Sequence, residues 1–293
     1  MKTDSNEASG ALFDLYGADA PDYPVLLSVP HAGRDYSDAV LTRARVPHAA
    51  LQRLEDRHAD LLIARLLDRG YPAIVARTPR AVIDLNRDAR DIDPRLVDII
   101  PPGQPLVQSA KQRGGLGLFP RLLPRCGDLW RAPMSWEAAR SHIETTHTPY
   151  HRALEEHLDR LQTEYGEVLL IDVHSMPPLP VARGERRVDV VIGDRFGASA
   201  MGRLAEAARA AVASHGLVAA LNHPYPGYYL LDRHGRPDKG RHALQIEISR
   251  DLYLDAALNE AGPGLRHIQS MLVDLVERLG QELIRGSWSE AAE

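Results

Sequence analysis

Short apolar runs rich in β-branched residues recur along the chain, separated by stretches whose apolar residues follow helical spacing. Near-continuous apolar runs are typical of strands covered on both faces, as in a largely parallel sheet. Strands that alternate with helices favour a three-layer α/β fold. The predicted strands are residues 25–29, 73–76, 81–85, 168–173, 188–192, 218–221 and 243–248.

Four helices are predicted between these strands. The first begins near Asp56, carries apolar residues at helical spacing and ends at Gly70. A longer helix is predicted from Trp136 to about Glu164, with a break near Pro149. The remaining two helices are predicted around residues 204–212 and over residues 265–284.

The domain organisation follows from the length and from the continuity of the pattern. A chain of 293 residues is long enough for two domains, although α/β folds of this length often form one unit. Residues 92–133 hold many Pro, Gly and Arg residues and little periodicity. We therefore predict a single catalytic α/β domain over residues 1–293, with an irregular insertion at about residues 92–133.

Composition restricts the kinds of site and partner. The chain has 13 histidines and one cysteine, which excludes an intramolecular disulfide and leaves His and carboxylate as the expected metal ligands. The net charge of -5 offers no basic footprint, so we expect no nucleic-acid partner. Residues 1–10 show no signal-peptide pattern and no run of 18 apolar residues occurs. We expect no membrane span and a cytoplasmic setting.

Two histidines stand at the ends of predicted strands. His31 follows the run 25–29, and His174 ends the run that begins at residue 168. Ligands of open α/β sheets bind outside the carboxyl ends of the strands, so these two histidines are expected to share a metal centre. Asp172 lies two residues before His174, on the same strand face, where it can orient the imidazole as an outer carboxylate. The alternative is that both are loop histidines bonded to their neighbours.

The third ligand is expected at the start of the first helix. Asp56 and Asp60 share the face that continues into Ile63, whereas Glu55 and His58 do not. An inward carboxylate is costly unless it is paired or bound to a metal. We favour Asp56 as the ligand and interpret Asp60 as ordinary helix N-terminal charge, with a neighbouring acid as the alternative to Asp56.

Two histidines, a carboxylate and an open position form the pattern of a catalytic zinc site, which also needs a proton carrier. Glu247 lies in the apolar run 243–248, where desolvation raises a carboxyl pKa and suits it to general base and acid work. The alternative is a structural salt bridge between Glu247 and Arg250 or Arg241.

An anionic substrate would need further cations. Arg80, Asp84 and Asn86 alternate along the predicted strand 81–85, and Arg87 follows it. Arginine binds carboxylates in a bidentate manner and an adjacent asparagine adds donors, so Asn86 and Arg87 are candidates for substrate binding.

Several other residues receive a more modest interpretation. The loop 222–227 is expected to line the pocket, with Tyr225, Tyr228 or Tyr229 in contact with substrate. His151 is expected to be a partly buried helix histidine, and Cys126 is assigned no role.

The segments that carry these candidates resemble the N-formylglutamate amidohydrolase family. Five short motifs match in order and approximate spacing across about residues 24–255. They are Ser28-Val-Pro-His-Ala-Gly33, Glu55-Asp56, Arg80 with Asp84-Leu-Asn-Arg87, Asp172-Val-His-Ser175 and Gln245-Ile-Glu-Ile-Ser-Arg250. The chain departs from the family where Tyr228 follows Gly227, at a place that often holds paired glycines, and in residues 95–133.

The resemblance implies a fold similar to the zinc carboxypeptidases and aspartoacylase, with a mixed sheet between helices and one zinc ion. It implies that His31, an acidic residue that we place at Asp56, and His174 bind the zinc. It also implies the remaining roles: Glu247 as general base and acid, Arg80 as stabiliser of the oxyanion, and Asn86 with Arg87 as the grip on a substrate carboxylate.

The expected activity is hydrolysis of an N-acyl amino acid. N-formyl-L-glutamate, cleaved to formate and glutamate as in histidine degradation, is the leading substrate. Another N-acyl amino acid or a short peptide is the first alternative. A non-catalytic carboxylate-binding protein on the same scaffold is the second. Nothing in the sequence indicates the oligomeric state.

Overall fold

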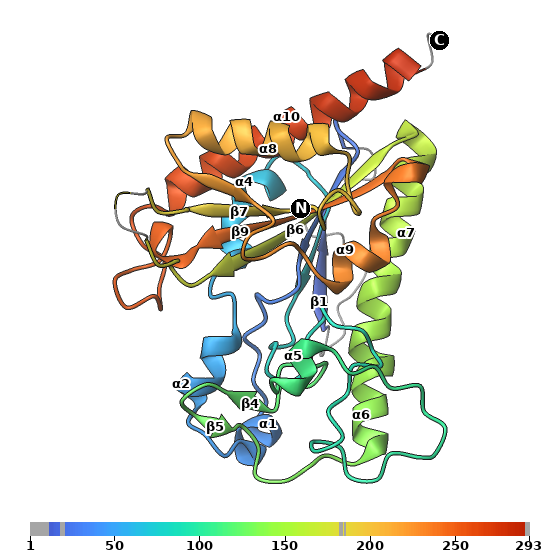
Figure 1. Ribbon diagram of the computed structural model, residues 1–293, viewed down its shortest axis with the longest axis vertical. Helices are drawn as coiled ribbons and strands as arrows, with labels where there is room; N and C mark the ends of the chain where they lie inside the picture. Colours follow the sequence, from blue (N-terminus) through green and yellow to red (C-terminus); the bar gives the residue numbers. More distant parts are fainter. Residues whose placement is uncertain (1–11, 18–20, 182–183, 185, 291–293) are drawn as a thin grey trace.

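A seven-stranded sheet lies between two layers of helices in the computed structural model of the chain (Figure 1). The structure describes residues 12–290 except 18–20, 182, 183 and 185. Residues 1–10, in which no signal-peptide pattern was found, lie outside the described residues. In spatial order the strands are β1 (Phe13–Tyr16), β3 (Ala73–Ala76), β2 (Val25–Val29), β6 (Val168–Met176), β9 (Arg241–Ser249), β7 (Val190–Gly193) and β8 (Ala219–Leu221).

The sheet is mixed and largely parallel, as predicted. β2 runs parallel to both β3 and β6, β6 runs parallel to β9, and β7 runs parallel to β8. Only β1 and β7 pair in antiparallel fashion, with β3 and β9 respectively. The central strand β6 is buried along its whole length, which explains its near-continuous apolar sequence.

The two helical layers cover opposite faces of this sheet (Figure 1). On one face, the side chains of Leu169 and Ile171 pack in a core with the helices α3 (Ala59–Leu62), α4 (Ala64–Leu67), α8 (Gly202–Ser214) and α10 (Leu265–Glu290). On the other face, Leu170 packs in a second core with α7 (Thr148–Tyr165) and α9 (Tyr229–His234). The three-layer α/β fold predicted from the alternating pattern is therefore confirmed.

Residues 92–133 pack beyond the carboxyl ends of the parallel strands. They contain only the helix α5 (Ala110–Arg113) and the two-residue strands β4 (Leu122–Leu123) and β5 (Gly127–Asp128). A third apolar core joins this segment to α1 (Asp38–Arg43), α2 (His48–Leu51), η1 (Gln52–Leu54) and α6 (Trp136–His142). Leu118 and Leu129 are its most deeply buried members from the segment. The segment therefore forms one wall above the sheet edge.

The predicted strand at residues 81–85 is wrong. These residues form a turn and an extended loop, and the amide of Asp84 donates to the carbonyl of Leu118 rather than to a sheet strand. The segment is nevertheless buried, because Ile83 packs in the third core and Leu85 in the second. An apolar run reports burial, and here the burial comes from a loop that crosses the end of the sheet.

Several helix and strand boundaries also differ from the prediction. The helix expected from Asp56 is two short helices, α3 and α4, which separate at Ile63. Pro149 does not break its helix: it lies in the first turn of α7, where its missing N–H costs little, and the π-helical turn η2 (Ile143–His147) precedes it. The strand predicted at residues 188–192 is β7, shifted toward the C-terminus, and β1 was not predicted.

The parallel arrangement determines where polar residues meet. β2, β6 and β9 end at the same edge of the sheet, and the register between β6 and β9 places His174 opposite Glu247. Among the described helices, none combines the length and apolar character that a bilayer crossing requires.

The sheet core yields a stability prediction. Ile171→Ala on β6 removes a fully buried side chain and should lower the free energy of unfolding by about 2–5 kcal/mol, because the lost burial is accompanied by a cavity. Urea denaturation of the purified variant measures this change. The control is Ile99→Ala, at a side chain that is 78% exposed, which should alter stability by less than about 0.5 kcal/mol. Equal losses in the two variants would contradict the assigned core.

Candidate active site

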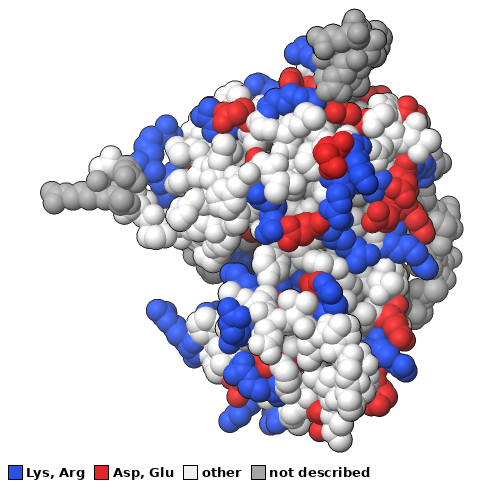
Figure 2. Space-filling model, turned by 45° about the vertical axis from the view of Figure 1, so that its right-hand side comes forward, with Lys and Arg blue, Asp and Glu red and all other residues white. Residues whose placement is uncertain are grey.

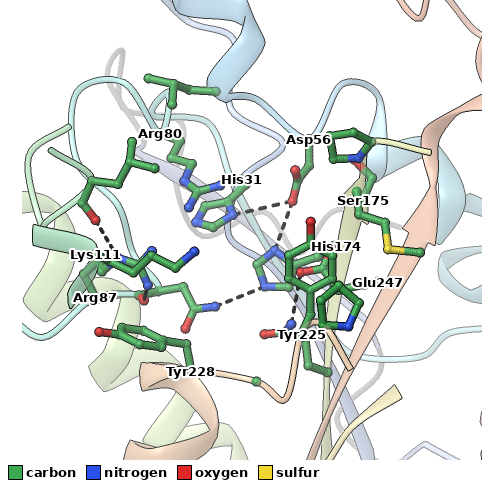
Figure 3. Close-up of a pocket in the computed structure, with 18 of the residues that line it drawn as sticks. His31, Asp56, Arg80, Arg87, Lys111, His174, Ser175, Tyr225, Tyr228 and Glu247 are labelled. Carbon is green, nitrogen blue, oxygen red and sulfur yellow. Dashed lines mark hydrogen bonds and ion pairs between the residues drawn. The ribbon is translucent and has the colours of Figure 1, made fainter. Parts of the chain in front are cut away.

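A cavity of about 530 Å³ opens at the carboxyl ends of β2, β6 and β9. Figure 3 shows side chains that point into it from these strands, from the loop that carries Asp56, and from α5 in the 92–133 segment. The favoured metal ligands, the proton carrier and the three cation or amide candidates all line this cavity, and Asp172 lies directly behind it; the lining candidates are His31, Asp56, His174, Glu247, Arg80, Asn86 and Arg87. The sheet edge predicted from the strand-end histidines is therefore where the candidates meet.

His31 follows β2 and is buried, with its two ring nitrogens in different surroundings. Nε2 lies 2.7 Å from Oδ1 of Asp84, so this nitrogen carries a proton that it donates to the carboxylate. Nδ1 points to the other side, 3.5 Å from Oδ2 of Asp56, and has no hydrogen-bond partner within the described structure. The free Nδ1 is thus presented toward Asp56.

His174, near the end of β6, repeats this arrangement. Its Nε2 lies 2.7 Å from Oδ2 of Asp172, and its Nδ1 lies 3.0 Å from Oδ2 of Asp56. Asp172 is itself fixed, because Ser28 on the neighbouring strand donates its hydroxyl proton to Oδ1 over 3.0 Å. The sequence placed Asp172 on the same strand face as His174, and in the structure the two side chains are in contact.

Asp56 lies between η1 and α3, and its backbone amide donates to the carbonyl of His31. Its Oδ1 accepts a hydrogen bond of 3.0 Å from Arg250. Burial opposes ionisation of this carboxyl, but the contacts with His174 and His31 outweigh that and hold its pKa well below the usual range. Asp56 is therefore a carboxylate that both imidazoles face.

The other candidate ligands near the start of this helix point away from the two histidines. Asp60 forms a two-bonded ion pair with Arg34, at 2.8 Å for each bond. Glu55 accepts from Arg57 over 3.0 Å, and His58 lies on the surface side of the loop against the carbonyl of Asn259. Of the four residues, the structure brings only Asp56 to the histidines.

His31, Asp56 and His174 together form a buried group whose donor atoms lie within 4.8 Å of one another. Each histidine turns one nitrogen to an outer carboxylate and the other toward Oδ2 of Asp56. Three electron-rich atoms that converge in a buried site need a cation between them, either protons or a metal ion. This group could therefore bind a metal ion through nitrogen and oxygen ligands.

Glu247 projects from β9 into the same cavity, opposite His174 in the register (Figure 3). Gln245 donates its amide proton to Oε1 over 3.0 Å. Burial raises the pKa of Glu247 to about 7, and the nearby charge of Asp56 adds to this shift while His174 and Arg80 oppose it. A carboxyl group with such a pKa can both accept and return a proton near neutral pH.

The salt bridges proposed as an alternative role for Glu247 are not formed. Arg250 pairs with Asp56, and Arg241 pairs with Glu155 and Asp159 on α7. Glu247 therefore faces the cavity without a guanidinium partner in the described structure.

Asp84 connects the metal-ligand group to the cationic wall of the pocket. Its Oδ1 accepts from His31, and its Oδ2 accepts from Nε of Arg80 over 2.9 Å. Its pKa is held well below the usual range, because the interactions with Arg80 and His31 outweigh the effect of burial. The sequence identified Asp84 in an alternating pattern and in one of the family motifs but assigned it no role, and its signal was a carboxylate inside an apolar run.

Asn86 and Arg87 lie beside this group. Asn86 Oδ1 accepts from the amide of Leu230 over 2.9 Å, and its Nδ2 lies 3.4 Å from Nε2 of His174. Arg87 donates from Nε to the carbonyl of Leu116 and stacks on the ring of Tyr228 at 4.2 Å. Both side chains are thus held in place before any ligand binds.

The pocket tyrosines, His151 and Cys126, which the sequence left outside the catalytic group, differ in where the structure places them. Tyr225 and Tyr228 line the cavity, whereas Tyr229 packs against His151 outside its lining. His151 is fully buried rather than partly buried, and donates from Nε2 to the carbonyl of Leu85. Cys126 accepts a hydrogen bond from Arg53 at 3.0 Å.

Sequence reasoning missed two contributors to the site. Arg250 was considered only as a partner for Glu247, although it binds Asp56. Lys111 falls in the 92–133 segment, where no periodicity connected it to the strand-end residues, and only the fold brings it into the pocket.

Comparisons with known proteins agree with this geometry. The sequence profile of the family described as N-formylglutamate amidohydrolase matches residues 23–254. The N-formylglutamate deformylases of Pseudomonas aeruginosa and Pseudomonas putida are each 31% identical over 236 residues, which cover 79% of this chain and 82% of the relatives.

Solved structures include a member of the same family and a second protein with the same fold. The crystal structure of N-formylglutamate amidohydrolase from Ralstonia eutropha JMP134 superposes with a TM-score of 0.86 at 30% identity, over 94% of this chain and 99% of that one. The product Atu2144 of Agrobacterium tumefaciens shares the fold, with a TM-score of 0.55 at 21% identity over 98% and 99% of the chains. This chain is a hydrolase that acts on an amide bond, and it belongs to the N-formylglutamate amidohydrolase family.

Proposed function

We propose that this chain is a zinc-dependent N-formylglutamate deformylase, which hydrolyses N-formyl-L-glutamate to formate and L-glutamate. The observation that carries the proposal is the convergence of His31, Asp56 and His174 beside Glu247. The substrate is supported by the names of the two curated relatives, both N-formylglutamate deformylases.

The donor set fits one zinc ion. Two imidazoles and one carboxylate leave a position open for substrate, which is the arrangement of catalytic zinc sites. His31 Nδ1, orphaned and buried, and His174 Nδ1 would hold the ion together with Oδ2 of Asp56. When bound, zinc acts as a Lewis acid that polarises a carbonyl oxygen and makes water a stronger acid.

Glu247 moves the proton in this proposal. It accepts a proton from the water that attacks the formyl carbon and passes that proton to the amide nitrogen as the C–N bond breaks. Its pKa of about 7, raised by burial, suits both halves of the transfer, and its position opposite His174 keeps it beside the reacting group.

Three further residues bind the substrate or stabilise the charge that develops on it. Arg80, anchored by its Nε to Asp84, stabilises the negative charge that develops on the carbonyl oxygen. Asn86 and Arg87 hold a carboxylate of the substrate, because the stacked and hydrogen-bonded Arg87 presents a fixed guanidinium edge.

The proposal also covers the domain organisation, the cellular location and the metabolic role of the chain. The described residues form one catalytic unit, in which the 92–133 segment supplies a wall of the pocket through Lys111, Leu116 and Leu123. A cytoplasmic location and a role in histidine degradation belong to this proposal, and the single cysteine favours a reducing compartment.

Loss of a ligand tests the metal site without reference to activity. His174→Ala removes one of the nitrogen donors and leaves Asp172 without its imidazole partner, so the purified variant should contain little zinc. Elemental analysis of metal per chain measures this. His267→Ala changes an exposed histidine on α10 and should retain the wild-type zinc content. A His174→Ala protein with full zinc would contradict the ligand assignment.

Loss of the proton carrier tests the catalytic role. Glu247→Gln keeps the shape and the hydrogen-bonding capacity of the side chain but removes the base, so kcat should fall by about 10²–10⁴-fold while zinc stays bound. Formate release and metal content are measured on the same sample. A Gln variant with wild-type kcat would show that another group carries the proton.

A further inference from the structure

Lys111 reaches into the pocket from α5, an element outside the sheet that carries the other candidates. Figure 3 shows Lys111, Arg87 and Tyr228 on the side of the pocket away from Asp56 and Glu247. This side chain has no part in the reaction steps described above. A lysine in a cavity that binds substrate therefore needs its own explanation.

Lys111 differs from the other cationic side chains of the pocket in its lack of a protein partner among the described residues. Six cationic side chains line the cavity, and five of them bind protein groups. Within the part of the chain that the structure describes, the Lys111 ammonium has no ion pair or side-chain hydrogen bond. The five partnered cations are Arg53 with Cys126, Arg80 with Asp84, Arg87 with the Leu116 carbonyl, Arg195 with Asp232, and Arg250 with Asp56.

The surroundings of Lys111 favour an anion. Burial lowers the pKa of Lys111, and the positive charges of Arg87 and Arg80 lower it further. On the face seen in Figure 2, by contrast, basic and acidic side chains are interspersed. The excess positive charge beside Lys111 is a local property of the pocket wall, and a bound carboxylate would relieve the repulsion.

A count of charges on this wall indicates how many carboxylates it can hold. Asp84 is the carboxylate shared by the two arginines, with Oδ2 2.9 Å from Nε of Arg80 and 3.7 Å from Nε of Arg87. One negative charge therefore stands against three positive charges when Lys111 is included. N-formyl-L-glutamate carries two carboxylates and no basic nitrogen, so its charge matches the excess.

The carboxylates can be assigned by their distance from the scissile amide. The α-carboxylate lies one carbon from the amide nitrogen, and Asn86, beside Arg87, lies 3.4 Å from the proposed ligand His174. Arg87 already uses Nε and Nη1 for the carbonyls of Leu116 and Asn86, which leaves one edge for a single carboxylate. The side-chain carboxylate needs a different cation, farther along the wall.

We propose that Lys111 binds the side-chain carboxylate of the substrate and thereby selects N-formyl amino acids that carry a second carboxylate. This inference rests on the proposed deformylase function and adds its specificity determinant. The chain has only three lysines, at positions 2, 111 and 239, against 32 arginines. A lysine at this place offers a compact charge on a flexible stem, which can follow a mobile side-chain carboxylate.

The test compares two substrates that differ only in the distal group. Wild type and Lys111→Met are assayed for formate release from N-formyl-L-glutamate and from N-formyl-L-glutamine, an isostere that keeps the α-carboxylate and replaces the distal carboxylate with a neutral amide. A charge-assisted hydrogen bond accounts for about 10- to 100-fold in kcat/KM. The ratio of kcat/KM for the two substrates should fall by that factor in Lys111→Met, mainly through KM of N-formyl-L-glutamate.

The control is Lys239→Met, at an exposed lysine outside the cavity, which should keep the wild-type ratio. An equal loss on both substrates in Lys111→Met would overturn the proposal, because it would place the ammonium at the reacting carbonyl. An unchanged ratio would overturn it as well. Either result leaves the deformylase function intact, whereas a wild type that releases formate from neither compound contradicts that function and the selectivity with it.

Discussion

Three buried carboxylates packed around two imidazoles are the constraint on which the site depends. Asp84 and Asp172 each hold one Nε2, so both Nδ1 atoms are left to face Asp56. Burying this much negative charge is costly unless cations compensate it, and Arg80 and Arg250 supply part of that compensation. Because these residues come from five separate segments, the network also fixes the loops that carry them against the sheet.

The strand topology of the sheet brings the residues of this network together. Parallel β2, β6 and β9 end at one edge, and their register brings the proposed base opposite a proposed ligand without any special loop. The 92–133 segment then closes the opposite side with its own apolar core, so that Lys111 faces the strand-end residues across the cavity. His174 and Glu247 thereby lie on strands of the sheet, whereas Lys111 comes from the irregular 92–133 segment.

Much of this could be predicted from the sequence. His31, His174 and Glu247 stand in apolar runs whose strands are parallel, and polar side chains at such positions are informative because the pattern there is otherwise apolar. The loop at residues 81–85 was mistaken for a strand because burial in a loop and burial in a sheet give the same apolar run. Lys111 and the hold of Asp84 on His31 depend on contacts between distant segments, which no local pattern records.

The claim that His31, Asp56 and His174 hold a catalytic metal ion is tested most directly by titration. Metal-free protein, prepared with a chelator, is titrated with Zn²⁺ while formate release from N-formyl-L-glutamate is followed. The protein should be inactive without metal, and its activity should rise until one zinc ion is present per chain. Full activity in the metal-free protein, or a rise that continues well beyond one ion per chain, would contradict the claim.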